Sequence, residues 1–129
     1  MKKIFIALLV MSIAFLFGCT SQEKPQEVKR ITPQEAKGMI DEKNKVIILD
    51  VRTEEEFNEG HLEGAILIPD YEITEKAEDV LTNKEATIIV YCRSGRRSSA
   101  ASETLSQLGY SNIYDMGGII DWPYEIVTE

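Results

Sequence analysis

Short apolar runs alternate with longer amphipathic segments over most of the chain. Two of the runs, residues 46–49 and 87–91, are rich in β-branched side chains, which is typical of strands buried on both faces. A shorter run stops at Pro69, and a last run leads into the pair Gly117 and Gly118. The pattern predicts strands over residues 46–49, 65–68 and 87–91, and a last strand that begins with residues 112–114 and is ended by the two glycines.

The segments between these runs have helical patterns. Thr32 and Thr53 each stand three residues before a glutamate, which is a capping-box pattern, and Pro33 suits a first helical position. We expect a short helix after Thr32, with Ala36, Met39 and Ile40 on one face, and a helical turn after Thr53 that carries Phe57. We also expect a helix over residues 71–83, with Ala77, Val80 and Leu81 facing inward, and one over residues 98–108, capped by Gly109.

The alternation of strands and helices predicts an α/β fold, with a parallel sheet covered by helices on both faces. The length fits a single domain with one core. Ligands of such sheets bind beyond the carboxyl ends of the strands. Two polar segments are expected there, residues 50–52 and residues 92–97.

The amino terminus has the features of an export signal. Lys2 and Lys3 precede residues 4–17, an almost wholly apolar stretch that is shorter than the roughly 20 residues of a membrane span. Gly18 and Cys19 follow, and this arrangement resembles the lipobox of bacterial lipoproteins. The resemblance implies a signal peptide over residues 1–18, lipid on Cys19 and a place in the bacterial cell envelope outside the cytoplasm. An uncleaved anchor with an incidental cysteine is the alternative, and it gives the same location. Residues 19–30 are polar and are interpreted as a tether, with the domain over residues 31–129.

The formal net charge of -8 excludes most nucleic-acid partners, because their phosphates would be repelled. It does not exclude a small anionic substrate, since a local group of arginines can attract one. One histidine and two distant cysteines cannot form a zinc site, so we expect no metal.

Residues 92–98 form a tight polar segment between a strand and a helix. Cys92 is expected at the carboxyl end of the strand, where unpaired N–H groups and the positive end of the helix dipole favour a thiolate over a thiol. Gly95 allows the backbone to turn with its amides directed at one centre. These features suit nucleophilic attack by Cys92. The positive charges that would hold an anion come from Arg93, Arg96 and Arg97.

A lone cysteine is more often a small buried apolar residue than a nucleophile. Three arginines within five residues argue against that interpretation, because an apolar core does not tolerate them.

The segment from Cys92 to Arg97 resembles the active-site loop of single-domain rhodaneses. Residues 50–57, the segment from Gly60 to Ile66 with Pro69 after it, and Gly117–Gly118 with Trp122 match the same family. The three motifs occur in the family's order and cover nearly all of the chain from about residue 31 to residue 122.

The resemblance implies a five-stranded, mostly parallel sheet and a sulfurtransferase that works by a ping-pong reaction. Cys92 would take the outer sulfur of a donor such as thiosulfate, carry it as a persulfide and pass it to cyanide or a thiol. We expect no cofactor beyond this sulfur, and we expect a monomer. The residues that would bind the anionic donor are Arg93, Ser94, Gly95, Arg96 and Arg97.

Other motif residues are expected to have structural roles. Asp50 and Arg52 can support the loop through an ion pair. His61 is expected to fix a turn by hydrogen bonds, and Trp122 to pack the carboxyl end against the body.

Two alternatives remain open at this stage. A phosphatase or arsenate reductase of related fold needs five residues between cysteine and arginine, and this chain has Ser98 at the required position. A module that delivers sulfur to one partner, or a thiol-redox module, would keep the reactive cysteine without turning over free thiosulfate.

Overall fold

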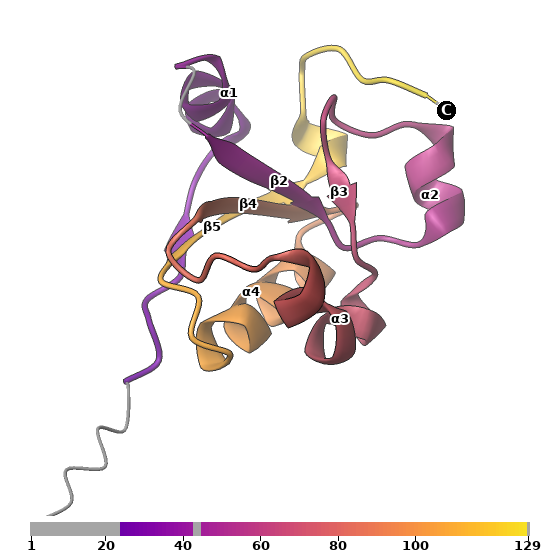
Figure 1. Cartoon of the computed structure of the whole chain (residues 1–129). Coiled ribbons are helices and arrows are strands. Elements are labelled where there is room, and N and C mark those ends of the chain that lie inside the picture. The colour runs from indigo at the N-terminus through magenta and orange to yellow at the C-terminus, as the bar shows by residue number, and fades with distance from the viewer. Residues whose placement is uncertain (1–23, 43–44, 129) are drawn as a thin grey trace, which may run out of the picture.

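The computed structural model describes residues 24–42 and 45–128, which form one sheet with helices on both faces (Figure 1). The expected signal peptide, the expected lipid site at Cys19 and the first part of the expected tether lie outside the described residues. No described helix is both long and apolar enough to cross a membrane.

The sheet has five strands in the order β1-β5-β4-β2-β3, and every neighbouring pair is parallel. The carboxyl ends of β2 and β4 therefore lie at the same edge, because residue 50 pairs with residue 91. The strands are β1 (Lys29–Arg30), β2 (Val46–Asp50), β3 (Ile66–Leu67), β4 (Thr87–Cys92) and β5 (Asn112–Gly118).

The helices lie on both faces of the sheet, α1 on one and α3 and α4 on the other (Figure 1). This confirms the predicted α/β fold, with a parallel sheet covered by helices on both faces. The helices are α1 (Pro33–Asp41), α2 (Glu54–Glu59), α3 (Ile73–Val80) and α4 (Arg96–Gln107), with short 3-10 turns at Asp70–Glu72 and Ile119–Asp121. Both predicted capping boxes are present, since Thr32 accepts from the Glu35 N–H and Thr53 from the Glu56 N–H.

Two apolar clusters hold these layers together. The larger one packs α3 and α4 on the sheet and contains Leu49, Val90 and Leu105, all fully buried. The smaller one lies under α1 and contains Ala36, Ile89 and Tyr91. Because α4 is fixed by the larger cluster, its first residues have a defined position relative to the end of β4.

The sequence analysis did not predict β1, and two of its expectations, the extent of the helix over residues 71–83 and the inward orientation of Val80, are wrong. Lys29 and Arg30 form β1 and pair with Tyr114 and Asp115, so the sheet begins two residues before the predicted start of the domain. The helix expected over residues 71–83 is a 3-10 turn followed by the shorter α3, which ends at Val80. Val80 was predicted to face inward and is 46% exposed, whereas Ala77 and Leu81 are buried as predicted.

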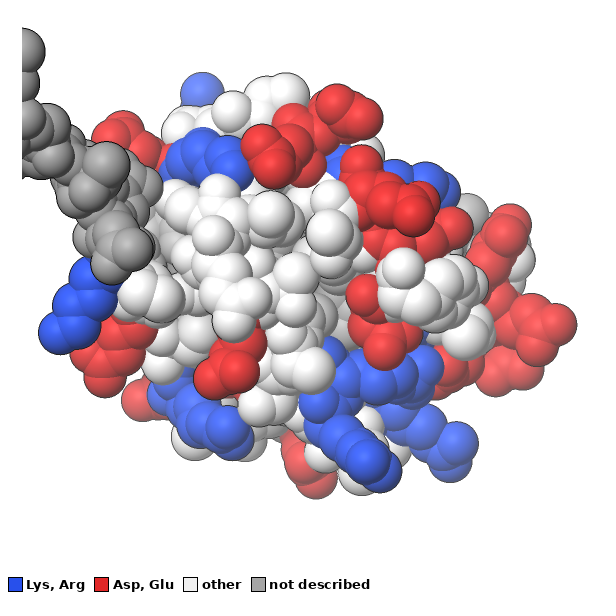
Figure 2. Space-filling model, turned by 90° about the horizontal axis from the view of Figure 1, so that it is seen from below, with Lys and Arg blue, Asp and Glu red and all other residues white. Residues whose placement is uncertain are grey.

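Charged side chains are unevenly distributed on the face covered by α3 and α4. In Figure 2 a group of lysine and arginine side chains lies beside groups of aspartate and glutamate, and the middle of the face has few charges. The negative net charge therefore leaves room for local regions of positive potential.

Leu81 and Val80 are adjacent, yet only Leu81 is buried, so together they test this packing. We expect Leu81→Ala to lower the free energy of unfolding by about 2–5 kcal/mol, since it opens a cavity in the larger cluster. Val80→Ala is the matched control and should change it by about 0.5 kcal/mol or less. Equal losses in urea denaturation would contradict the packing described here.

Candidate functional site

Cys92 is the last residue of β4, and its thiol lies beneath the turn that starts α4. The residue is only 1% exposed. The Gly95 N–H donates a hydrogen bond to the Cys92 Sγ over 3.0 Å. Gly95 precedes the first residue of α4, so the first N–H groups of this helix, which have no acceptor inside the helix, lie in the same region. A negative charge in this region would lie near the partial positive charge of those N–H groups.

The shape of the loop depends on two glycines. Gly95 has φ +106°, a left-handed conformation that a side chain would strain. Gly118 lies directly against the loop, and a Cβ there would come within 2.3 Å of the Arg93 carbonyl oxygen and 2.7 Å of the Ser94 Cα. The Arg93 carbonyl oxygen also accepts from the Ile120 N–H. The backbone at the end of β5 therefore packs directly against the loop.

A buried serine and aspartate hold the loop from below. The Ser98 hydroxyl is 2.8 Å from the Asp115 Oδ1 and 3.0 Å from the Gly95 carbonyl oxygen. The same Asp115 oxygen accepts from the Gly117 N–H at 2.9 Å. Ser98 and Asp115 are 0% and 5% exposed. Their hydrogen bond connects the first turn of α4 to β5. Because the Ser98 hydroxyl also contacts the Gly95 carbonyl oxygen, the backbone of Gly95, whose N–H donates to the Cys92 Sγ, is restricted in its position.

The three arginines of the loop have different surroundings. Arg97 makes a two-pronged ion pair with Glu56 of α2, with N–O distances of 2.7 and 2.9 Å. This pairing lowers the pKa of Glu56 to about 2, against an opposing effect of burial, and raises the pKa of Arg97. Arg93 and Arg96 are exposed. They are the better placed of the three to meet an anion that arrives from solvent.

Asp50 and Arg52 form the ion pair that the sequence suggested. The Arg52 Nη2 is 2.7 Å from the Asp50 Oδ2 and also donates to the Gly60 carbonyl oxygen, and both residues are buried. Burial alone would lower the pKa of Arg52, but its bonds to Asp50 raise it overall. The Arg52 guanidinium lies 5.5 Å from the ring centre of Tyr91, beside Cys92 in the chain. Burial, with the nearby Asp50 charge, raises the pKa of Tyr91, which keeps its hydroxyl neutral.

His61 and Trp122 have the structural contacts expected of them. The His61 ring stacks on Phe57 at 3.7 Å, and its Nδ1 lies 2.8 Å from the Phe57 carbonyl oxygen. The backbone of His61 also pairs with Val127. Trp122 packs edge-on against Tyr124. The His61–Val127 pairing holds the carboxyl end beside α2, and Trp122 also packs against the smaller apolar cluster.

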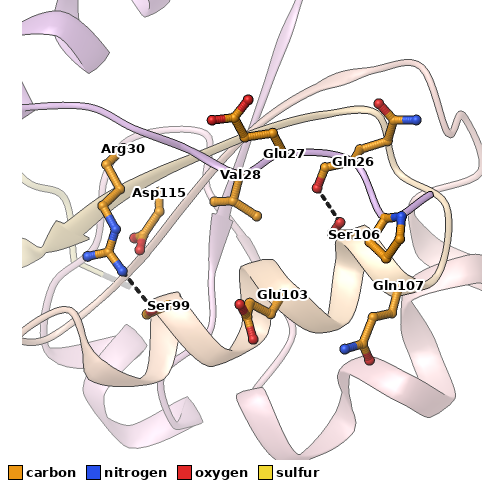
Figure 3. Close-up of a pocket in the computed structure, with 10 residues that line it drawn as sticks. Gln26, Glu27, Val28, Arg30, Ser99, Glu103, Ser106, Gln107 and Asp115 are labelled. Atoms are coloured by element: carbon orange, nitrogen blue, oxygen red, sulfur yellow. Dashed lines mark hydrogen bonds between the residues drawn. The ribbon is translucent and has the colours of Figure 1, made fainter.

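Two cavities bear on the assignment of the site. One, of about 430 Å³, lies between the amino-terminal segment and α4 (Figure 3). In it the Arg30 guanidinium donates to the Ser99 hydroxyl, and the Ser106 hydroxyl donates to the Gln26 backbone carbonyl oxygen. Its lining residues do not include Cys92. The other, of about 420 Å³, borders the loop and is lined by Arg93, Glu56 and the carboxyl-terminal segment. Cys92 is not among the lining residues of the second cavity either, but that cavity is lined by Arg93, which follows Cys92 in the chain.

The structure brings Cys92 and the loop residues 93–97 together at one end of the sheet, with Asp50 and Arg52 at the same edge. Sequence reasoning missed Glu56, the partner of Arg97, and the pair Ser98–Asp115. The sequence indicated Glu56 only as the glutamate of a capping box, and that position was the one signal that its side chain is oriented. Asp115, in a strand, had no signal of its own.

The sequence was compared with known families and proteins. Residues 32–123 match the model of the rhodanese-like domain, which is more than half of the chain. The chain belongs to the rhodanese-like domain family. Among its relatives it is 40% identical over 73 residues to the thiosulfate sulfurtransferase PspE of Escherichia coli, covering 57% of this chain and 70% of that protein. It is 33% identical over 106 residues to the putative sulfur carrier protein YrkF of Bacillus subtilis, covering 81% of this chain but 56% of that protein.

Solved structures show the same fold. A rhodanese from E. coli, determined with anions, superposes with a TM-score of 0.61 at 36% identity, over 65% of this chain and 99% of that chain. A rhodanese-related protein from Thermoplasma volcanium gives a TM-score of 0.69 at 33% identity, over 78% of this chain and 99% of that chain. This rhodanese-like domain is therefore a member of a sulfurtransferase family with the expected five-stranded sheet.

The Glu56–Arg97 pair should make the stability of this rhodanese-like domain depend on pH. Because the folded-state pKa of Glu56 is about 2, below its ordinary 4.5, the pair stabilises the fold above about pH 4.5 and is lost as the pH falls toward 2. We expect Glu56→Gln to cost about 1 kcal/mol or less at pH 7, because both side chains are partly exposed. The cost should shrink at about pH 3. Glu55→Gln on the same exposed turn is the control, and an equal pH response in both variants would refute the pairing.

The Ser98–Asp115 contact should contribute to stability independently of any activity. Ser98→Ala leaves a buried carboxylate with one donor fewer, so we expect the free energy of unfolding to fall by about 1–3 kcal/mol. Ser94→Ala removes an exposed hydroxyl from the same loop and should cost about 0.5 kcal/mol or less. Denaturant titrations of the two variants make the comparison. A cost for Ser98→Ala no larger than that for Ser94→Ala would show that the contact does not hold the loop.

Proposed function

We propose that this domain is a sulfurtransferase that moves sulfane sulfur from an anionic donor such as thiosulfate to a thiophilic acceptor, through a persulfide on Cys92. The observation that carries the proposal is the 3.0 Å hydrogen bond from the Gly95 N–H to the Cys92 Sγ at the start of α4. A backbone donor held in this way stabilises negative charge on sulfur without reorganising during the reaction.

In the first half-reaction the Cys92 thiolate attacks the outer sulfur of the donor. A bond forms between Sγ and that sulfur, the sulfur–sulfur bond of thiosulfate breaks, and sulfite leaves with the electron pair. The negative charge then rests on the outer sulfur of the persulfide, near the N-terminus of α4. Arg93 and Arg96, which are exposed, attract the doubly charged donor, and Ser94 and Gly95 contribute the loop around it.

In the second half-reaction a thiolate or cyanide attacks the outer sulfur. The persulfide bond breaks, and Cys92 recovers its thiolate. No net oxidation occurs in either step, so no redox cofactor is required. Arg97 has a different role, because its ion pair with Glu56 ties α4 to α2 and keeps the loop in place.

A sulfur carrier that serves one partner is the second candidate, and one observation favours it. A relative that matches over 81% of this chain is named a putative sulfur carrier protein. Such a carrier would use the same persulfide but would accept or release sulfur only in a docked complex. Export and lipid attachment at Cys19, proposed from the sequence, would place either activity at the outer side of a membrane.

The persulfide can be tested directly. The domain that lacks residues 1–19 is incubated with thiosulfate, and its intact mass is measured. We expect a gain of about 32 Da that is lost on addition of cyanide. Cys92→Ser should show no gain and should keep the cooperative unfolding of the parent. If the parent shows no gain, thiosulfate is not its donor, and loss of folding in Cys92→Ser would assign Cys92 a structural role.

A further inference from the structure

Asp115 is a buried carboxylate beside the active-site loop, and it has no part in the reaction steps proposed above. It stands in β5 and is only 5% exposed. Burying a charged group is costly unless hydrogen bonds compensate for the lost water. A negative charge near a reactive thiol also opposes the negative charge that the thiol develops. Packing alone therefore does not account for this residue.

The carboxylate joins two parts of the chain that both contact Gly95. The Asp115 Oδ1 accepts a hydrogen bond from the Ser98 hydroxyl at 2.8 Å and another from the Gly117 N–H at 2.9 Å. Ser98 belongs to the first turn of α4, and its hydroxyl lies 3.0 Å from the Gly95 carbonyl oxygen. Gly117 belongs to β5, and its Cα is 3.5 Å from the position that a Cβ of Gly95 would take. One oxygen of Asp115 therefore holds two neighbours of Gly95.

The contact between Asp115 and Gly117 coincides with the irregularity of β5. After Asp115 the pairing with β4 passes over one residue of β5, so that Gly118 lies opposite Cys92. A carboxylate that accepts from the N–H two residues later offers the backbone an alternative to the regular hydrogen bonds of a strand. Asp115 therefore helps to determine which residue of β5 faces Cys92.

These contacts lead to the sulfur atom through Gly95. The Gly95 N–H donates to the Cys92 Sγ over 3.0 Å, and the strength of a hydrogen bond falls steeply when the donor turns away from the acceptor. A glycine has no side chain to fix its backbone and can adopt many conformations. The direction of this N–H therefore depends on the groups around Gly95, and Ser98 and Gly117, both held by Asp115, are two of them.

We propose that Asp115 is a positioning residue for Cys92, which directs the Gly95 N–H at the sulfur by holding Ser98 and Gly117 in place. The inference rests on the proposed function, in which this N–H stabilises negative charge on sulfur. Asp115 acts through geometry, whereas its own negative charge opposes a thiolate. The two effects have opposite signs, so an experiment can separate them.

Two substitutions separate the geometry of Asp115 from its charge. Asp115→Asn and Asp115→Leu are close in size and both remove the negative charge, but only asparagine keeps an oxygen that can accept from Ser98 and Gly117. The asparagine amide can be accommodated, because residue 115 lines the cavity of about 430 Å³ beside α4 (Figure 3).

The reactivity of Cys92 is measured in the full chain with iodoacetamide, a neutral reagent, and peptide mass separates its alkylation from that of Cys19. The gain of sulfur from thiosulfate is followed in parallel by intact mass. We expect Asp115→Leu to be alkylated about tenfold more slowly than the parent, as the loss of a hydrogen bond to a charged group implies. Its maximal rate of sulfur gain should fall similarly, whereas the thiosulfate concentration at half of that rate should not change, because the exposed loop arginines remain. Asp115→Asn should react at least as fast as the parent, because it keeps the contacts and loses the opposing charge.

Two further variants control for stability. Leu81→Ala opens a cavity in the larger apolar cluster without removing a contact of Asp115, and its alkylation rate should stay within about twofold of that of the parent. Ser98→Ala removes one of the two donors to Asp115 and should slow alkylation by about threefold. If Asp115→Leu no longer unfolds cooperatively in urea, Ser98→Ala decides the question, and a rate equal to that of the parent overturns the inference.

The outcomes separate this inference from the proposed function. If a folded Asp115→Leu reacts as fast as the parent, or if Asp115→Asn is slowed as much as Asp115→Leu, the inference is overturned. Equal slowing in Leu81→Ala also overturns it, since lost stability would then account for the effect. If thiosulfate adds no mass to the parent, the proposed function fails, and the alkylation rates still decide whether Asp115 positions Cys92.

Discussion

The pairing of β5 with β4 is the constraint on which the candidate site depends. The two strands run in register up to Val90 and Asp115, and the next pair is Tyr91 with Gly117, so β5 has one extra residue at this point. The extra residue changes what the end of β5 presents to the loop. Asp115 reaches the first turn of α4, and Gly118 comes so close to the backbone of the loop that no side chain fits between them. A regular strand would place Gly117, and not Gly118, opposite Cys92.

Some charged side chains of the site are paired with one another and hold the structure together, whereas others are exposed and can bind an anion. Four charged side chains form two ion pairs. Asp50 pairs with Arg52 at the carboxyl end of β2, and Glu56 of α2 pairs with Arg97 of α4. Breaking a buried pair such as the first costs about 3–5 kcal/mol, because one charge is left without a partner. The exposed loop arginines remain available to an anion. An acidic protein can thus attract anionic sulfur compounds, since its local field differs from its net charge.

The sequence predicted the parts of the fold that local patterns determine. The runs that became β2 and β4, and the threonines that cap α1 and α2, are specified by residues close in the chain. It did not predict β1, because two charged residues have no strand pattern, and only the edge of β5 makes Lys29 and Arg30 extended. Val80 was misplaced because α3 ends there, and the face of a last turn is decided by the chain that follows. The motif placed Cys92 and its loop correctly at the sheet edge. It did not predict which of the loop arginines is held in an ion pair, because the partner of Arg97 is Glu56, which lies 41 residues away in the chain.

The burial of Cys92 explains why a separate surface for the acceptor is advantageous. A thiol that is 1% exposed is protected from solvent and from oxidation, but it is also difficult for a bulky acceptor to reach. In the persulfide the reacting atom is the outer sulfur, one bond farther from Sγ, so the second half-reaction takes place farther from the sheet than the first. The loop therefore suffices to recognise a compact donor by charge. An acceptor with a larger body needs contacts outside the loop, and the cavity of about 420 Å³ lined by Arg93, Glu56 and the carboxyl-terminal segment adjoins the loop.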